Sequence, residues 1–232
     1  MRFTKRFSEQ TTMKQTFLTD GGYFDLDGLL GMCEGAEPLR AVLRDHGAAF
    51  AAAKGSGRNH QAWEGGYLDH VRETMNIARW LYATSPRALP FKLSDALVVM
   101  FLHDVEKPFK ETARRKRQVW CCQQCGLRDC DDPAVAEHQA LDNWSNEGGA
   151  EPEDIWEPWT KEERREFRAN LIARYGVQLT EEQQNALRYV EGVPDKEYTP
   201  GERTMGELAA FCHCCDMLSA RLWHDKGKER AW

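Results

Sequence analysis

Apolar residues recur every three to four positions in several segments of this chain, which is the pattern of amphipathic helices. The first such segment spans about residues 37–53 and carries Leu39, Val42 and Phe50 on one stripe. Residues 54–59 contain two glycines, which end a helix readily. The pattern therefore predicts a helix that buries one face.

Later segments repeat this pattern. Gly65 and Gly66 precede a helix that runs to about residue 83. Two more begin with capping signals, at Thr160 and Thr180. The remaining expected helices span about 133–146, 160–175, 180–191 and 204–225. Because no alternating strand pattern of any length occurs, we predict an all-α fold.

The stretch from Ser94 to Pro108 stands apart, because Ala96 to Leu102 is apolar on every side and predicts a buried helix. Ser94 and Asp95 are candidate N-terminal caps. The apolar run ends abruptly at His103 and Asp104. Taken alone, this pair fits a helix end with Asp104 facing solvent. Whether it belongs to a functional site depends on other polar residues that could lie beside it.

Two further residues supply candidate partners. His70 lies beside the apolar stripe of its helix, and Asp216 lies inside the apolar last helix. A lone carboxylate there would be costly, so Asp216 needs a metal ion or a salt bridge, for example to Arg221. Imidazoles and carboxylates from several helices are typical ligands of a divalent cation.

The chain resembles the HD-domain metallophosphohydrolase superfamily in three motifs. Gly65–His70 is similar to the family's Gly-Gly-Leu-x-x-His, and Leu102–Lys107 is similar to Leu-His-Asp-Ile-Gly-Lys. Cys215–Arg221 is similar to Ala-Asp-x-Leu-Ser/Asp-Ala-Arg. The resemblance covers about residues 60–225, and the motifs are more specific together than singly. Glu106 departs from the family, which usually has Gly there.

The resemblance implies an HD-domain-like helical bundle, which we expect to span residues 37–232. We also expect an N-terminal arm at 1–36 and a Cys-containing loop insertion at about 118–132. The resemblance further implies an enzyme that hydrolyses a phosphomonoester or phosphodiester of a nucleotide through a metal-activated water. The metal would be Mn, Fe, Ni, Co, Zn or Mg. Its expected ligands are His70, His103, Asp104 and Asp216.

Other residues near these motifs could act on the substrate. Lys107 would neutralise phosphate charge, and Asp104 would be catalytic as well as a ligand. His60 would act as a general acid or a phosphate contact. Each also has a simpler interpretation, because Lys107 could be a surface lysine and His60 an exposed loop histidine. We expect three more side chains to bind substrate, namely Lys110, Arg114 and Trp63.

These substrate contacts depend on local structure. On a helix, Lys107, Lys110 and Arg114 would share one face and attract a polyanion. Trp63 could stack on a base. The alternatives are a solvated charged face and a core aromatic residue.

Two other functions fit the same motifs. An HD-type di-iron oxygenase needs extra histidine ligands, for which His138 is our candidate. Because a dinuclear site usually needs two, we expect one metal. A non-catalytic nucleotide-binding module would use the same cleft without turnover.

A second metal site could lie in the insertion. The chain has eight cysteines, and the spacing of Cys122, Cys125 and Cys130 before His138 fits a structural zinc site. Cys121 is an alternative ligand. The other interpretation is a set of free thiols in the loop.

The bulk composition limits the remaining choices. At 232 residues with 41% apolar residues, the chain is long and apolar enough for a globular core. No apolar run reaches the roughly 20 residues that span a bilayer, and no apolar stretch follows the basic N-terminus. We therefore expect a cytoplasmic protein with no membrane partner. The net charge of −6 argues against a stable nucleic-acid complex.

Overall fold

A computed structural model describes residues 22–56, 61–109, 115–119, 153–157, 159–194 and 197–221. The chain divides into two compact units. The first combines Met1–Pro108 with Arg165–Trp232, and the second is Phe109–Arg164. The second unit is longer than the insertion of 118–132 predicted from the sequence.

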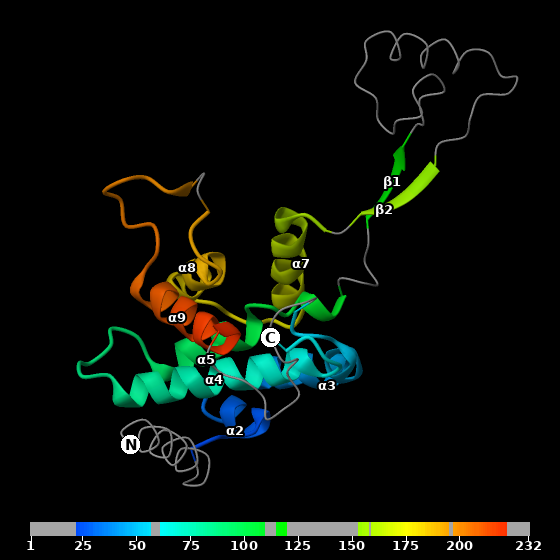
Figure 1. Ribbon diagram of the computed structural model, residues 1–232. Coiled ribbons are helices and arrows are strands. Elements are labelled where there is room, and N and C mark those ends of the chain that lie inside the picture. Colours follow the sequence, from blue (N-terminus) through cyan, green and yellow to red (C-terminus); the bar gives the residue numbers. More distant parts are fainter. Residues whose placement is uncertain are drawn as a thin grey trace, which may run out of the picture. The chain divides into compact units, whose positions relative to one another are not determined.

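The described part of the chain is largely helical (Figure 1). A short 3₁₀ helix, η1, spans Lys107–Phe109. The α-helices are α2 (Leu26–Leu30), α3 (Glu37–Ala52), α4 (Gly66–Thr84), α5 (Leu93–Leu102), α7 (Lys161–Arg174), α8 (Glu181–Tyr189) and α9 (Glu207–Arg221). Five of these confirm helices predicted from apolar periodicity, although α9 begins three residues later than expected. The all-helical prediction is confirmed for the described residues of the first unit.

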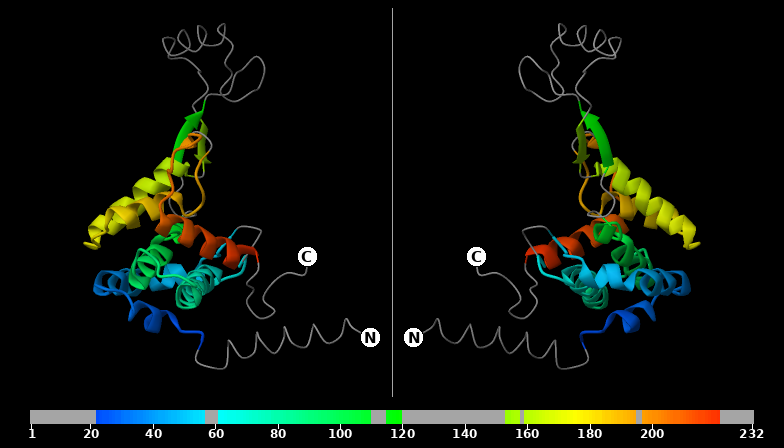
Figure 2. Two further views of the ribbon diagram at one scale, coloured as in Figure 1. Left: turned by 90° about the vertical axis from the view of Figure 1, so that its left-hand side faces the viewer. Right: turned by 90° about the vertical axis from the view of Figure 1, so that its right-hand side faces the viewer.

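Helix α5 forms the centre of the first unit. It contacts α4, α8 and α9, and α9 lies across α4 and α5 in both views of Figure 2. Every residue from Ala96 to Leu102 is at most 5% exposed, as the all-round apolar sequence predicted. A helix buried on every side holds its end rigidly, so the residues that follow Leu102 are fixed in the core.

The start of α5 shows how its predicted caps act. The Asp95 carboxylate accepts the backbone N–H of Lys92 at 2.9 Å, so Lys92 is the N-cap and Asp95 completes a capping box. Ser94 lies inside the helix, and its hydroxyl accepts the N–H of Glu34 at 2.7 Å. Only Asp95 therefore caps this helix.

The two capping signals later in the chain are confirmed. The Thr160 hydroxyl accepts the N–H of Glu163 at 3.1 Å, and the Glu163 carboxylate accepts the N–H of Thr160 at 2.7 Å. Thr180 and Gln183 exchange the same pair of bonds at 3.2 and 2.9 Å. These bonds satisfy amides that would otherwise lack partners at the starts of α7 and α8.

Residues 22–36 of the predicted arm include buried structure. Leu29 and Leu30 of α2 are fully buried. The Asn76 side chain accepts the backbone N–H of Phe24 at 2.8 Å and donates to its carbonyl at 2.9 Å. This part of the segment is therefore packed against α4.

The second unit contains an antiparallel pair of strands, β1 (Arg115–Val119) and β2 (Glu153–Glu157), in which Arg115 faces Glu157. These strands contradict the all-α prediction for this part of the chain. Lys107 begins η1, and Lys110 and Arg114, which would share its face on a helix, lie outside the described residues. The expected helix at 133–146 lies outside the described residues. Within the described residues, none of the helices combines the length and apolarity that a membrane span needs.

Candidate metal centre

The centre forms where three helices of the first unit meet. Helix α4 supplies His70, the end of α5 supplies His103 and Asp104, and α9 supplies Asp216. The first three residues are at most 2% exposed. One ligand atom from each lies within 4.8 Å of the others, which fits a shared metal ion. The structure thus brings together residues that are up to 146 positions apart in the chain.

The two histidines face each other, and both carboxylates approach them. Nε2 of His70 lies 3.2 Å from Nε2 of His103. Oδ2 of Asp104 lies 3.5 Å and 3.3 Å from these nitrogens. Oδ1 of Asp216 lies 3.2 Å and 3.6 Å from the same two atoms. Asp216 therefore approaches both histidines, next to the group formed by His70, His103 and Asp104.

The orientation of His103 indicates that a positive charge is needed between the two histidines and the two carboxylates. Its Nδ1 lies 2.7 Å from the carbonyl oxygen of Met100, which can only accept, so Nδ1 is the donor. The neutral ring then carries a lone pair on Nε2, directed at a second imidazole nitrogen and two carboxylates. Such an arrangement needs a positive charge, which either a proton or a metal ion can supply. The donor set therefore fits a divalent cation.

The electrostatics of the cluster agree with this. Burial alone would lower the pKa of His103, but Asp104 and Asp216 raise it to about 10. Burial alone would raise the pKa of Asp104, but Lys107 and His103 hold it well below its usual range. Burial acts in the same direction on Asp216, and bonds with His103 and His70 hold the pKa of its carboxyl below its usual range. Both carboxyls stay ionised, which favours a cation.

Lys107 belongs to this cluster and is not a fully exposed surface lysine. Its ammonium group contacts Oδ2 of Asp104, and its side chain is 17% exposed. Burial alone would lower its pKa, but Asp104, Asp216 and Glu106 raise it, so the side chain stays charged. Asp216 is 20% exposed at its side chain. These two side chains form the part of the centre that solvent reaches.

Glu106, the departure from the family pattern, is also buried, at 2% exposure. Its Oε2 lies 4.0 Å from Nη1 of Arg168, and the same Nη1 donates to the carbonyl of His103. Burial, Asp104 and Glu106 together raise the pKa of Tyr67 well above its usual value. The acidic side chains after α5 thus lie in one buried region.

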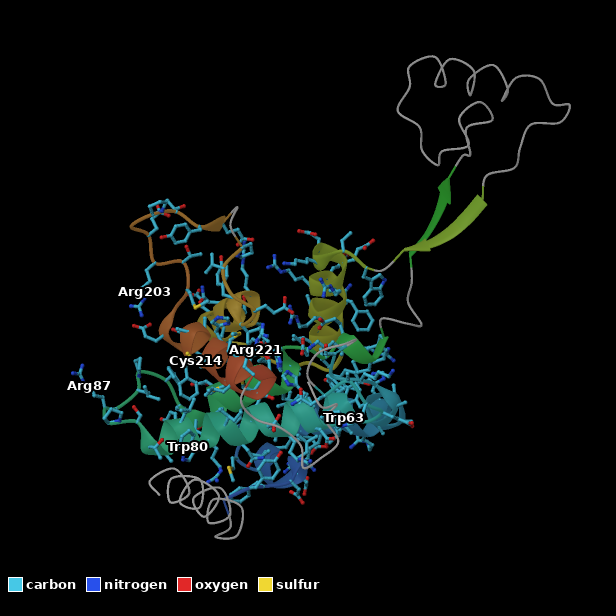
Figure 3. All side chains as sticks on the ribbon, in the orientation of Figure 1. Trp63, Trp80, Arg87, Arg203, Cys214 and Arg221 are labelled. Atoms are coloured by element: carbon cyan, nitrogen blue, oxygen red, sulfur yellow. The ribbon has the colours of Figure 1, made fainter. Side chains whose placement is uncertain are left out.

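Trp63, the predicted base-stacking residue, is half-buried (Figure 3). Its Nε1 donates to Oδ2 of Asp69 at 2.9 Å, and Oδ1 of Asp69 accepts from Arg72 at 2.9 Å. These bonds fix the indole against the first turn of α4. Stacking on a base stays a prediction.

Several predicted site residues lie outside the described residues: His60, Lys110, Arg114, Cys122, Cys125, Cys130 and His138. The structural zinc site therefore stays a prediction. His213 also lies between the His-Asp pair and Asp216, and our sequence analysis overlooked it as a candidate second-metal ligand. Its Nδ1 donates to the carbonyl of Val190 at 2.7 Å, so that nitrogen is engaged with backbone.

The sequence analysis also missed three buried polar residues beside the centre, namely Gln61, Glu73 and Ser219. Ser219 lies 3.1 Å from Nδ1 of His70. Glu73 follows His70 by one helical turn inside a buried helix, and a carboxylate at such a position is the signal that could have revealed it.

A scan against protein-family models, a search of curated proteins and a search of solved structures found no match to this chain. Function must therefore be inferred from the residues and their geometry.

Proposed function

We propose that this protein is a metal-dependent phosphohydrolase that acts on a phosphomonoester or phosphodiester of a nucleotide. The observation that carries the proposal is the buried convergence of His70, His103 and Asp104 on one point. Asp216 approaches the same point from α9. Two imidazoles and two carboxylates suit a divalent transition metal or Mg, and do not select among them.

The cation and the side chains would have different roles in hydrolysis at this centre. A bound cation would lower the pKa of a coordinated water and polarise a phosphoryl oxygen. His70, His103, Asp104 and Asp216 would hold the cation. Lys107 would leave its contact with Asp104 and neutralise charge on the phosphoryl group.

The placement of Lys107 favours an anionic substrate. Its charged group lies in the part of the centre that solvent reaches, next to the carboxylate that would bind the metal. A phosphate arriving there would meet the ammonium group and the cation together. The motif resemblance to HD-domain enzymes supports a nucleotide as the phosphate ester.

The test uses the full chain, stripped of metal and reloaded with Mn²⁺ or Co²⁺. It is incubated with mononucleotides, triphosphates, cyclic nucleotides and short oligonucleotides, and release of phosphate or nucleoside is measured. We expect turnover by the wild type and none by Asp104→Asn or Asp216→Asn. Asp45→Asn is the matched control, since Asp45 lies on α3 and bonds to Tyr175. It should retain activity.

Metal content and binding separate the alternatives. One ion per chain agrees with the proposal. Two irons per chain with oxygen consumption would identify an oxygenase. Tight nucleotide binding without product, in metal-loaded protein, would identify a binding module and refute hydrolysis.

A further inference from the structure

A buried polar network lies directly behind His70, on the side of the ring away from the metal centre. Nδ1 of His70 lies 3.1 Å from the Ser219 hydroxyl, which donates to Oε2 of Glu73 at 2.7 Å. Nε2 of Gln61 donates to the same Glu73 oxygen and lies 3.3 Å from the Ser219 hydroxyl. All four residues are at most 3% exposed. These contacts are too enclosed to be incidental surface bonds.

The helical spacing places this network in register with the metal ligands. Glu73 follows His70 by three residues on α4, and Ser219 follows Asp216 by three residues on α9. Residues three apart lie on the same face of a helix. Each helix therefore presents one metal ligand and one network residue. Where α4 packs on α9, Asp216 meets Nε2 of His70 and Ser219 meets Nδ1.

The direction of the hydrogen bonds follows from what each group can donate. An ionised carboxylate only accepts and an amide nitrogen only donates. The single proton of the Ser219 hydroxyl goes to Glu73, so its oxygen accepts from Nδ1 of His70. Nε2 of Gln61 donates both to Oε2 of Glu73 and to the Ser219 hydroxyl oxygen. Because this nitrogen cannot accept, it does not compete with Glu73 for the Ser219 proton. Nδ1 of His70 therefore carries a proton, and Nε2 of the neutral ring has its lone pair on the metal side.

The backbone at Gln61 supports a specific role for this arrangement. Gln61 has a φ of 44°, in the left-handed region that non-glycine residues seldom adopt. Its carbonyl accepts the N–H of Gly55 at 2.9 Å. A backbone conformation of this kind is energetically unfavourable and is concentrated at functional sites. In this conformation the Gln61 side-chain amide contacts Glu73 and Ser219.

We propose that Glu73, acting through Ser219, is a positioning residue that fixes His70 with Nδ1 protonated and presents Nε2 to a divalent cation. The inference rests on the cation site of the proposed function and extends it behind the ligands. A carboxylate behind a metal-binding histidine fixes the tautomer and raises the basicity of the ligand. His103 has a backbone carbonyl in the same role. The two histidines are thus held by different partners.

The experiment measures the Zn²⁺ dissociation constant by chelator competition in the full chain. Glu73→Gln keeps the shape of the side chain and removes its charge, and Ser219→Ala removes the connecting hydroxyl. Each should weaken binding by about 10- to 100-fold. The double variant should be no weaker than the more affected single variant, because both changes break one chain of bonds.

Asn76→Ala is the matched control. Asn76 is a fully buried polar residue on the same helix, and it bonds to Phe24 instead of the centre. If a loss of helix stability were enough to lower Zn²⁺ affinity, this variant would also bind Zn²⁺ more weakly. We expect Asn76→Ala to bind Zn²⁺ like the wild type.

A spectroscopic readout distinguishes positioning from general support. In Zn²⁺-loaded wild type, ¹⁵N spectra of the imidazoles should show a slowly exchanging Nδ1–H on His70. The signal should exchange faster or disappear in Glu73→Gln and Ser219→Ala, and persist in Asn76→Ala. Unchanged Zn²⁺ affinity and an unchanged Nδ1–H in Glu73→Gln overturn the proposal, as does a double variant whose loss is the product of the two single losses. Weakened binding without any nucleotide turnover would refute the proposed hydrolysis and leave the positioning role intact.

Discussion

Gly66, the first residue of α4, lies so close to the Gln61 backbone that a residue with a side chain would not fit there. A Cβ at position 66 would lie 2.0 Å from the Gln61 carbonyl oxygen and 2.8 Å from its carbonyl carbon. Real Cβ contacts below 3.0 Å are essentially unknown, so Gly66→Ala would push this oxygen away by at least about 1 Å. The same oxygen accepts the Gly55 N–H, and the shift would weaken that bond.

The cost follows from these contacts. Overpacking costs about 1–3 kcal/mol, and a weakened backbone hydrogen bond adds about 1 kcal/mol. We expect Gly66→Ala to lower the free energy of unfolding by about 2–4 kcal/mol, measured by urea denaturation. Moving Gln61 also disturbs its bonds to Glu73 and Ser219, so Zn²⁺ affinity should fall as well.

Gly47→Ala is the control with the opposite sign. Gly47 lies inside α3, and a Cβ there meets no atom within 4 Å. Alanine in a helix interior is more stable than glycine by about 0.5–1 kcal/mol, so this variant should be stabilised. If Gly66→Ala behaves like Gly47→Ala, then Gln61 does not pack against the start of α4 and the reasoning fails.

Three further results are expected. Asn76→Ala should lower the free energy of unfolding by about 2–3 kcal/mol in urea, because both backbone groups of Phe24 lose their partner; no loss would show that Phe24 is not held there. Cys214 is exposed whereas burial raises the pKa of Cys215, so iodoacetamide mapped by mass spectrometry at pH 8 should modify Cys214 at least about ten times faster, and equal rates would contradict the burial. Saturation with a divalent cation at about 100 times its dissociation constant should add about 2.7 kcal/mol to the free energy of unfolding, reversed by EDTA. Asp104→Asn should show a much smaller response in calorimetry.

Sequence reasoning located most of the helices and the four side chains that the structure brings close together, because both leave local signals. Apolar periodicity marks a helix, and a polar residue in an apolar run, such as Asp216, marks a position that needs a partner. The capping box at Thr180 likewise lies within four residues. Helix α2 escaped prediction because five residues are too few to show a period.

Contacts between residues far apart in the sequence were not predicted, for a different reason. Ser219 and Glu73 are 146 residues apart, and neither shows in the sequence that it meets the other. The pairing of β1 with β2 also joins distant segments, and the charged composition of both concealed their extended structure. Opposite charge, as between Arg115 and Glu157, was the available signal. Such features depend on which surfaces pack together, and periodicity along one segment does not report that.

Glu106 shows how a departure from a motif can be accommodated by a distant residue. A buried carboxylate two positions after Asp104 adds negative charge beside ionised ligands, which is costly without compensation. Arg168 of α7 approaches it at 4.0 Å and also donates to the carbonyl of His103, the residue that caps α5. The guanidinium therefore partly offsets the charge of Glu106, and its bond to the His103 carbonyl ties α7 to the turn that carries the candidate ligands. Glycine at position 106 would remove the ion pair with Arg168 and leave only the bond from Arg168 to the His103 carbonyl, so Glu106 and Arg168 together form one charged pair beside the candidate metal centre.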